Sequence, residues 1–248
     1  MKIYAAIRRG IGKEQCEDVV IIQNTVVCDD TAELVFSKNG AICVADGVGG
    51  NEGGYIAASY VAKQLMSFTS PFADLNEESV RNHIMDINKN LIQEGTILGL
   101  PNMATTLTGL VCLENQKYLI HIGNTRAYVL QGQYLKQMTV DHTVYQRLLN
   151  MGRIDQATEC RRNEITNCLG GKNTLLAVDL YVAPCQDFCE MLLTSDGVHD
   201  YISLEEMEHL LTIKGLSGLD KCESILKAAS SAKSTDDMSV VIIINREE

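Results

Sequence analysis

The segment from Ala104 to Lys136 constrains the fold most, because strand-like runs follow one another there without an intervening helix. Apolar alternation and β-branched residues predict strands at 104–113, 117–123 and 126–131. Short polar turns join these strands, and strands joined this closely pair antiparallel, because a parallel pair needs a crossover of about a dozen residues or more. The segment therefore predicts an antiparallel meander and argues against a series of strand–helix–strand units.

The same patterns predict the other elements. Further strands are expected near 2–7, 18–23, 41–46, 175–182, 188–194 and 238–244. Apolar residues spaced three and four apart predict helices at 53–68, 76–97, 144–149, 203–212 and 219–229. Because long helices stand apart from runs of strands, the pattern is typical of a layered α+β sandwich.

Composition limits the class of protein. The chain has 248 residues, 46% of them hydrophobic, which is enough to bury a large core. Since no linker rich in Ser, Gly or Pro interrupts it, we expect one domain over residues 1–248. No run approaches the roughly 18 apolar residues of a membrane span, and the first apolar stretch is too short for a secretory signal. The net charge of −11 argues against a general nucleic-acid binder, which needs a basic surface.

The cysteines show no disulfide framework. There are nine, an odd number, and Cys28, Cys43 and Cys112 lie in or beside apolar runs, where thiols usually pack. Cys185 and Cys189 have no second Cys or His pair at zinc spacing. Reduced thiols indicate a cytoplasmic protein.

Acidic residues follow or precede three apolar strands. Asp46 ends the run that begins at Ala41, Asp196 follows the run 188–194, and Asp236-Asp237 opens the last strand. Carboxylate oxygens suit hard divalent cations, which in turn hold phosphate. Each Asp-Gly pair alone is equally explained as a turn between strands. Three acidic strand ends together favour a metal site.

Two glycine-rich segments raise the question of a nucleotide loop. The segment Gly47-Val48-Gly49-Gly50-Asn51-Glu52 fails the dinucleotide pattern at its last position. Gly170-Gly171-Lys172-Asn173 lacks the Ser or Thr of a phosphate-binding Walker loop. Neither segment therefore fits a nucleotide-binding loop.

A fourth acidic pair lies near the N-terminus. Lys13 precedes Glu17-Asp18 by four positions, and an apolar strand follows from Val19. Taken alone, this segment is better explained as a solvated loop before a strand. Taken with the other acids, it is expected to supply outer carboxylates that orient metal-bound water.

Five short phrases are spread over nearly the whole chain. They are Lys13 to Asp18; Ala45-Asp46-Gly47-Val48-Gly49-Gly50; Ala104-Thr105-Thr106-Leu107 with Ile122-Gly123-Asn124-Thr125-Arg126; Ser195-Asp196-Gly197-Val198; and Thr235-Asp236-Asp237-Met238-Ser239. These phrases and their order resemble those of the metal-dependent protein phosphatase family (PPM, or PP2C-like), especially its compact bacterial members. The segment 140–172 is similar to the bacterial flap.

The resemblance implies an α-β-β-α sandwich of two antiparallel sheets flanked by helix pairs, with a binuclear Mn²⁺ or Mg²⁺ centre at one end. It implies that Asp46 bridges both metals and that the Gly47 carbonyl binds one of them. Asp196 and Asp236 hold the other metal, and Glu17 and Asp18 act directly or through water. Catalysis is then assigned to Asp46, Asp18 and Glu17 with a metal-activated water that attacks phosphorus.

Four positions depart from the family pattern. Lys13 stands where a phosphate-binding Arg is usual, and Arg8 or Arg9 is a possible substitute. Cys16 stands where Asn is usual, which removes a hydrogen bond beside the metal ligands. Asn124 replaces the Asp that helps hold a third metal, so a third ion is expected to bind poorly there. Asp237 replaces an Asn beside the last ligand and adds negative charge.

The expected function is hydrolysis of phosphoserine and phosphothreonine in proteins, with a cognate Ser/Thr kinase as a possible partner. One alternative is a catalytically weak regulatory module that binds a phosphoprotein or kinase, because of the changes at Lys13, Asn124 and Asp237. Another is a phosphatase of small phosphomonoesters. His142 and His199 lie near the motifs and are candidate proton donors to the leaving oxygen, although a histidine near a site is more often a structural hydrogen-bonder.

Overall fold

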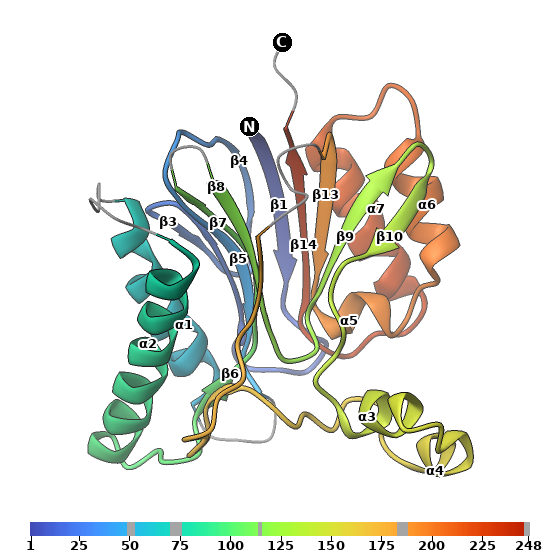
Figure 1. Ribbon diagram of the computed structural model, residues 1–248. Helices are drawn as coiled ribbons and strands as arrows, with labels where there is room; N and C mark the ends of the chain where they lie inside the picture. The colour runs from blue at the N-terminus through green and yellow to red at the C-terminus, as the bar shows by residue number, and fades with distance from the viewer. Residues whose placement is uncertain (49–52, 70–75, 114–115, 183–187, 246–248) are drawn as a thin grey trace.

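The computed structural model describes residues 1–48, 53–69, 76–113, 116–182 and 188–245. It contains two six-stranded antiparallel sheets that face each other, with helices on both outer faces (Figure 1). The order of layers is therefore helix, sheet, sheet, helix, and the predicted α+β sandwich is confirmed.

The first sheet has the order β10-β9-β13-β14-β1-β4. Its central strand β14 pairs antiparallel with β1 on one side and with β13 on the other. The strands are β10 (Tyr134–Gln137), β9 (Arg126–Gln131), β13 (Glu190–Thr194), β14 (Met238–Ile244), β1 (Lys2–Arg8) and β4 (Thr31–Val35).

The second sheet has the order β12-β8-β7-β5-β2-β3. Its strands are β12 (Asp179–Val182), β8 (Gln116–Ile122), β7 (Leu107–Leu113), β5 (Gly40–Asp46), β2 (Asp18–Ile22) and β3 (Thr25–Val27). Two short strands, β6 (Ala104–Thr105) and β11 (Leu169–Gly170), form a separate pair.

The helices lie in two groups. α1 (Gly54–Leu65), the short 3₁₀ helix η1 (Met66–Thr69) and α2 (Glu77–Ile97) cover the second sheet, and α6 (Leu204–Thr212) and α7 (Gly218–Ser231) cover the first (Figure 1). α5 (Asp196–His199) follows β13 directly. α3 (Val144–Asn150) and α4 (Ile154–Glu159) project from one end of the sandwich, within the predicted flap segment.

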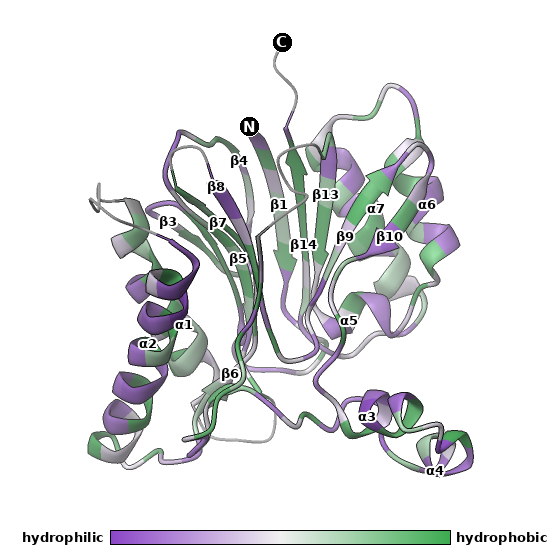
Figure 2. Cartoon of the chain, viewed as in Figure 1, coloured by the Kyte–Doolittle hydropathy of each residue, from purple (hydrophilic) through white to green (hydrophobic). Residues whose placement is uncertain are grey.

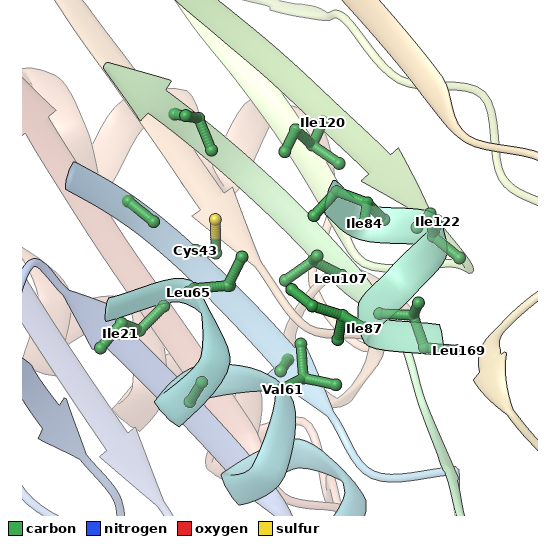
Figure 3. Close-up of a cluster of buried hydrophobic side chains, with 14 of the residues drawn as sticks. Ile21, Cys43, Val61, Leu65, Ile84, Ile87, Leu107, Ile120, Ile122 and Leu169 are labelled. Carbon is green, nitrogen blue, oxygen red and sulfur yellow. The ribbon is translucent and has the colours of Figure 1, made fainter. Parts of the chain in front are cut away.

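Three apolar layers hold the sandwich together. One lies between the sheets and includes Ile3, Val44 and Val241. A second joins α1 and α2 to the second sheet, where Val61, Leu65 and Ile84 pack near Leu107 and Ile120 (Figure 3). The third joins α6 and α7 to the first sheet. The strands in the middle are mostly apolar along their whole length, as expected for sheets buried on both faces (Figure 2).

Most predicted elements are present, with changed bounds. The predicted strand 104–113 is broken at Thr106 into β6 and β7, and the predicted strand 175–182 begins only at Asp179. The predicted helix 53–68 tightens into a 3₁₀ turn after Leu65. The short elements β3, β4, β11, α4 and α5 were not predicted.

Antiparallel pairing brings the acidic strand ends to one end of the sandwich. β2 and β5 pair with Asp18 opposite Asp46. In the first sheet β13 ends at Thr194, opposite Val240 near the beginning of β14, so the residues after β13 lie beside those before β14. The fold therefore gathers residues from four distant segments at the mouth between the sheets. Among the described helices, none is long and apolar enough to cross a membrane.

Candidate metal centre

Four aspartates converge at this end of the sandwich. The charges of Asp18, Asp196 and Asp236 all act on the Asp46 carboxyl, and Asp236 and Asp46 both act on the pKa of Asp196. Of the sequence-predicted ligands, Asp46, Asp196 and Asp236 are therefore brought together.

Burial and mutual repulsion disfavour the charged forms of Asp18, Asp46 and Asp196. Asp18 is fully buried, and its burial, with the charges of Asp237 and Asp196, raises its pKa to about 7 despite hydrogen bonds from serine side chains. Burial, Asp236 and Asp200 raise the pKa of Asp196 to about 6. Burial and then Asp18 raise the pKa of Asp46 well above its ordinary value. Carboxylates perturbed in this way are stabilised by a bound cation.

The backbone of Asp46 and Gly47 is fixed by threonines of the neighbouring strand. The Asp46 carbonyl accepts hydrogen bonds from the Thr106 N–H at 2.8 Å and from the Thr105 hydroxyl at 2.9 Å, and the Asp46 N–H donates to Thr106 Oγ1 at 3.0 Å. The Gly47 N–H donates to the Glu17 carbonyl at 3.1 Å. A Cβ at Gly47 would lie 2.5 Å from the backbone carbon of Gly54, so only glycine fits.

The oxygens of three aspartates are held by protein donors. Ser239 Oγ donates to Asp18 Oδ2 at 2.7 Å, and Asn124 Nδ2 donates to Asp196 Oδ2 at 2.8 Å. Lys13 Nζ donates to Asp236 Oδ1 at 2.5 Å. With these contacts in place, no three Asp, Glu, His or Cys side chains of the described residues are grouped closely enough to enclose a metal ion.

The donor set nevertheless fits a hard divalent cation. Asp18 Oδ1 is buried and has no hydrogen-bond partner in the structure, which is costly for a carboxylate oxygen. The site offers only oxygen ligands from Asp side chains and backbone, the type that Mn²⁺ and Mg²⁺ prefer. These residues can hold such an ion once the protein donors give way.

Lys13 is surrounded by three acids. Its ammonium lies 3.0 Å from Asp237 Oδ2 and 3.9 Å from Glu17 Oε2, besides its contact with Asp236. Burial lowers the pKa of Lys13, but the hydrogen bonds to Asp236 and Asp237 outweigh it, and the net shift is upward. The predicted phosphate-binding residue thus contacts the candidate metal ligands directly. Of its suggested substitutes, Arg9 is bound elsewhere, to the Glu14 carbonyl at 2.8 Å.

Asp237 is a buried junction between three segments. Its side chain is 2% exposed. Oδ1 accepts from the Gly10 N–H at 2.7 Å, and Oδ2 accepts from the Glu17 N–H at 2.8 Å and from Lys13. Both oxygens are therefore used as acceptors, which explains why an acid rather than an amide stands here.

We predict that Asp237→Asn destabilises the protein, although Asn is the usual family residue. One of the two side-chain oxygens becomes an NH₂ group that faces an N–H donor, and Lys13 loses a partner. The free energy of unfolding in urea should fall by about 1–3 kcal/mol. Asp86→Asn on the exposed face of α2 is the matched control and should change little. Equal stability of Asp237→Asn and the wild type would contradict this account.

Asn124 lies at the edge of a small polar cavity. The cavity has a volume of about 90 Å³ and is lined by Asn124, Arg126, Asp141, Tyr145, Arg162, His199 and Asp200. Arg126 is committed to Asp141 by hydrogen bonds of 2.7–3.1 Å. Asn124 Oδ1 is buried without a partner, while its amide nitrogen holds Asp196. Asn124 therefore acts on the site as a hydrogen-bond donor.

The two candidate proton donors have structural contacts. His142 Nε2 lies 3.1 Å from Asp179 Oδ2, and Nδ1 lies within hydrogen-bond distance of the Gly123 N–H and Asn167 Nδ2. His142 thus joins the flap to β12. His199 is buried and bonds Thr194 Oγ1 through Nδ1, and burial, then Arg126, lowers its pKa well below the ordinary value. These contacts agree with a structural hydrogen-bonding role for both histidines, which was the alternative to proton donation.

Sequence reasoning assigned no role to several residues that shape the site. Ser239 binds Asp18, the Ser195 hydroxyl accepts from the Ser239 N–H at 2.8 Å, and Thr105 and Thr106 fix Asp46. All four lie within the phrases that carry the family resemblance, beside the acids. They could have been identified from the sequence by their position next to a predicted ligand. The neighbouring residues Gly49, Gly50, Asn51 and Glu52 lie outside the described part of the chain, as does Cys185.

Comparison with known proteins identifies the relatives. The family model for protein phosphatase 2C matches residues 21–221. The chain is 29% identical to the serine/threonine phosphatase stp of Listeria monocytogenes, covering 82% of this chain and 83% of that one. It is also 29% identical to the protein phosphatase PhpP of Streptococcus pneumoniae, covering 84% and 86%.

Solved structures agree with the fold. The serine/threonine phosphatase Stp1 of Staphylococcus aureus superposes with a TM-score of 0.83 at 24% identity, covering 99% of this chain and 95% of that one. The catalytic domain of the phosphatase PstP, solved with two manganese ions, superposes with a TM-score of 0.74 at 25% identity, covering 98% of both chains. Since the family model matches most of the chain and the architecture agrees, the chain belongs to the protein phosphatase 2C family.

Proposed function

We propose that this protein hydrolyses phosphoserine and phosphothreonine in proteins and requires Mn²⁺ or Mg²⁺. The convergence of Asp18, Asp46, Asp196 and Asp236 at one end of the sandwich, where burial raises the carboxyl pKa values of the first three, carries this proposal. The stp and PhpP relatives are named as phosphatases, and the PstP domain holds two Mn²⁺ ions, which supports the assignment.

The residues have distinct proposed roles. Asp46 would be shared by two ions, the Gly47 carbonyl would hold one of them, and Asp196 and Asp236 would hold the other. When bound, two such ions acidify water and neutralise the oxygens of a phosphoryl group. Asp18, held by Ser239, and Glu17, held through its N–H by Asp237, orient the attacking water.

Lys13 is the proposed phosphate contact. Its ammonium already lies among Asp236, Asp237 and Glu17, so it is positioned at the edge of the carboxylate cluster. A lysine offers a point charge where an arginine offers a planar fork, so phosphate is held with less geometric restriction. Asp237 keeps the ammonium in place.

A third metal ion is not expected beside Asn124. The amide nitrogen donates to Asp196 Oδ2, and a neutral amide is a poorer ligand than a carboxylate for these cations. We predict that a calorimetric Mn²⁺ titration gives two ions for the wild type and three for Asn124→Asp. Asn124→Ala controls for loss of the amide contact and should not gain an ion. The same count in wild type and Asn124→Asp would contradict this explanation.

The proposed substrates are proteins phosphorylated on Ser or Thr. The proposed partner is the Ser/Thr kinase that phosphorylates them. The proposed setting is the cytoplasm, with no nucleic-acid or membrane ligand. The single domain over residues 1–248 also remains a proposal. The second candidate function, a regulatory module with weak turnover, is favoured by one observation: Lys13 is hydrogen-bonded to the proposed ligand Asp236.

Substrate comparison tests this proposal. Phosphate release in Mn²⁺ should be faster from a phosphothreonine peptide than from p-nitrophenyl phosphate or a sugar phosphate at equal concentration. Preference for the small esters would instead indicate a small-molecule phosphatase. Tight binding of the phosphopeptide without release from any substrate would indicate the regulatory module.

A further inference from the structure

Cys16 and Cys28 are brought together beside the candidate metal centre. Cys16 lies in the loop before β2, and Cys28 directly follows β3. They are twelve positions apart in sequence, and Cys28 Sγ lies 3.7 Å from the Cys16 carbonyl oxygen. Each thiol also shifts the pKa of the other. Because β2 and β3 form a hairpin, this proximity is built into the fold.

The two thiols have different surroundings. Cys16 is buried, 3% exposed, whereas Cys28 is half-buried at the edge of the inter-sheet core. The neighbouring Cys16 thiol lowers the pKa of Cys28, against the effects of burial and of Asp29. Burial raises the pKa of the Cys43 and Cys222 thiols, which pack in the core. The pair thus consists of a reachable, more acidic thiol with a second thiol directly behind it.

We propose that Cys16 and Cys28 form a reversible disulfide when the protein meets a hydroperoxide. The Cys28 thiolate attacks the peroxide, the O–O bond breaks, and a sulfenic acid and an alkoxide or hydroxide result. The Cys16 sulfur then attacks the Cys28 sulfur, the S–S bond forms, and the departing hydroxide takes the Cys16 proton to leave as water. Both sulfurs are oxidised by one electron each, and the peroxide accepts the two electrons.

This disulfide would act on the metal centre through the backbone. Cys16 Sγ donates to the Asp18 carbonyl at 3.6 Å, and the next residue, Glu17, is bound through its N–H to Asp237 and through its carbonyl to Gly47. A disulfide needs about 2.05 Å between sulfurs, so Cys16 has to leave the Asp18 carbonyl. The segment that carries Glu17 and Asp18 moves with it. This effect rests on the proposed function, whereas formation of the disulfide does not.

The test uses the full chain with hydrogen peroxide, followed by alkylation of free thiols and mass spectrometry of the peptides. The expected product is a peptide cross-link between Cys16 and Cys28 that a dithiol reductant removes. Affinity for Mn²⁺, measured by calorimetry, should fall about tenfold or more after oxidation and return after reduction. Cys28→Ser should bind Mn²⁺ like the wild type and keep that affinity in peroxide. The control Cys189→Ser, which alters an exposed cysteine outside the pair, should respond like the wild type.

Two results would overturn the proposal. One is full alkylation of Cys16 in the oxidised wild type, which does not depend on how any variant folds. The other is a Cys16–Cys28 disulfide with unchanged Mn²⁺ affinity, which would remove the link to the site. If the reduced wild type fails to bind Mn²⁺ at all, the proposed function fails, and the cross-linked peptide still decides whether the disulfide forms.

Discussion

Asp46→Asn is expected to lower kcat/KM for a phosphothreonine peptide in Mn²⁺ by about a thousandfold, the order found when one preorganised charged or polar group is removed from an active site. Asp46 is the acid on which the charges of Asp18, Asp196 and Asp236 all act. An amide of the same shape cannot bridge two cations. The measurement is steady-state phosphate release at saturating Mn²⁺.

The fold should survive this change. Asp46 is positioned through its backbone by Thr105 and Thr106, and those hydrogen bonds do not involve the carboxylate. The midpoint of urea unfolding in chelator should therefore not fall. Asp86→Asn, on the exposed surface of α2, is the matched control for charge removal and should keep full activity. Activity of Asp46→Asn within threefold of the wild type would remove Asp46 from the proposed centre.

Gly197→Ala is expected to cost about 3 kcal/mol or more of unfolding free energy, or to prevent folding. An added Cβ would lie 2.0 Å from the Asp237 carbonyl oxygen and 3.3 Å from Asp236 Cβ. α5, which follows β13, and the segment before β14 approach this closely, and each carries a candidate ligand. Urea unfolding measures the loss, and a calorimetric titration should show weakened Mn²⁺ binding in any folded fraction.

Gly132→Ala is the control for Gly197→Ala, because it introduces backbone strain without a steric clash. Gly132 has a φ of +68° and nothing within 4 Å of an added Cβ, so alanine there meets only the cost of the left-handed conformation. That cost is about 1–2 kcal/mol. If Gly197→Ala were no more destabilised than Gly132→Ala, the close approach of the two turns would not be needed for stability.

The central layers were predictable because their sequence signals are strong. The strands β5, β7, β8 and β14 are buried runs of β-branched and other apolar residues, and the helices α2 and α7 have clear apolar faces. The short strands β3 and β4 were not predicted. They have only three and five residues, and few of these residues are buried, so their sequence pattern is weak. Both form because they pair with a neighbouring strand at the edge of a sheet.

The site was predictable as a set of acids but not as a set of contacts. The acids stand at the ends of apolar strands, and Asp46 and Asp196 are each followed by a glycine, which the sequence shows directly. Lys13, by contrast, contacts Asp236 and Asp237, which lie 223 and 224 positions further along the chain. Such a contact depends on how β1 and β14 pair. The contact between Cys16 and Cys28 likewise depends on the hairpin of β2 and the unpredicted β3.

Phosphate release from a phosphothreonine peptide by the wild type, with Mn²⁺ present, after chelation, and after Mn²⁺ is restored, tests the central claim most directly. The proposed centre predicts turnover in Mn²⁺, its loss in chelator and its recovery when the metal returns. Turnover that persists unchanged in chelator, or no turnover in a folded sample that binds Mn²⁺, would contradict metal-dependent hydrolysis by these aspartates.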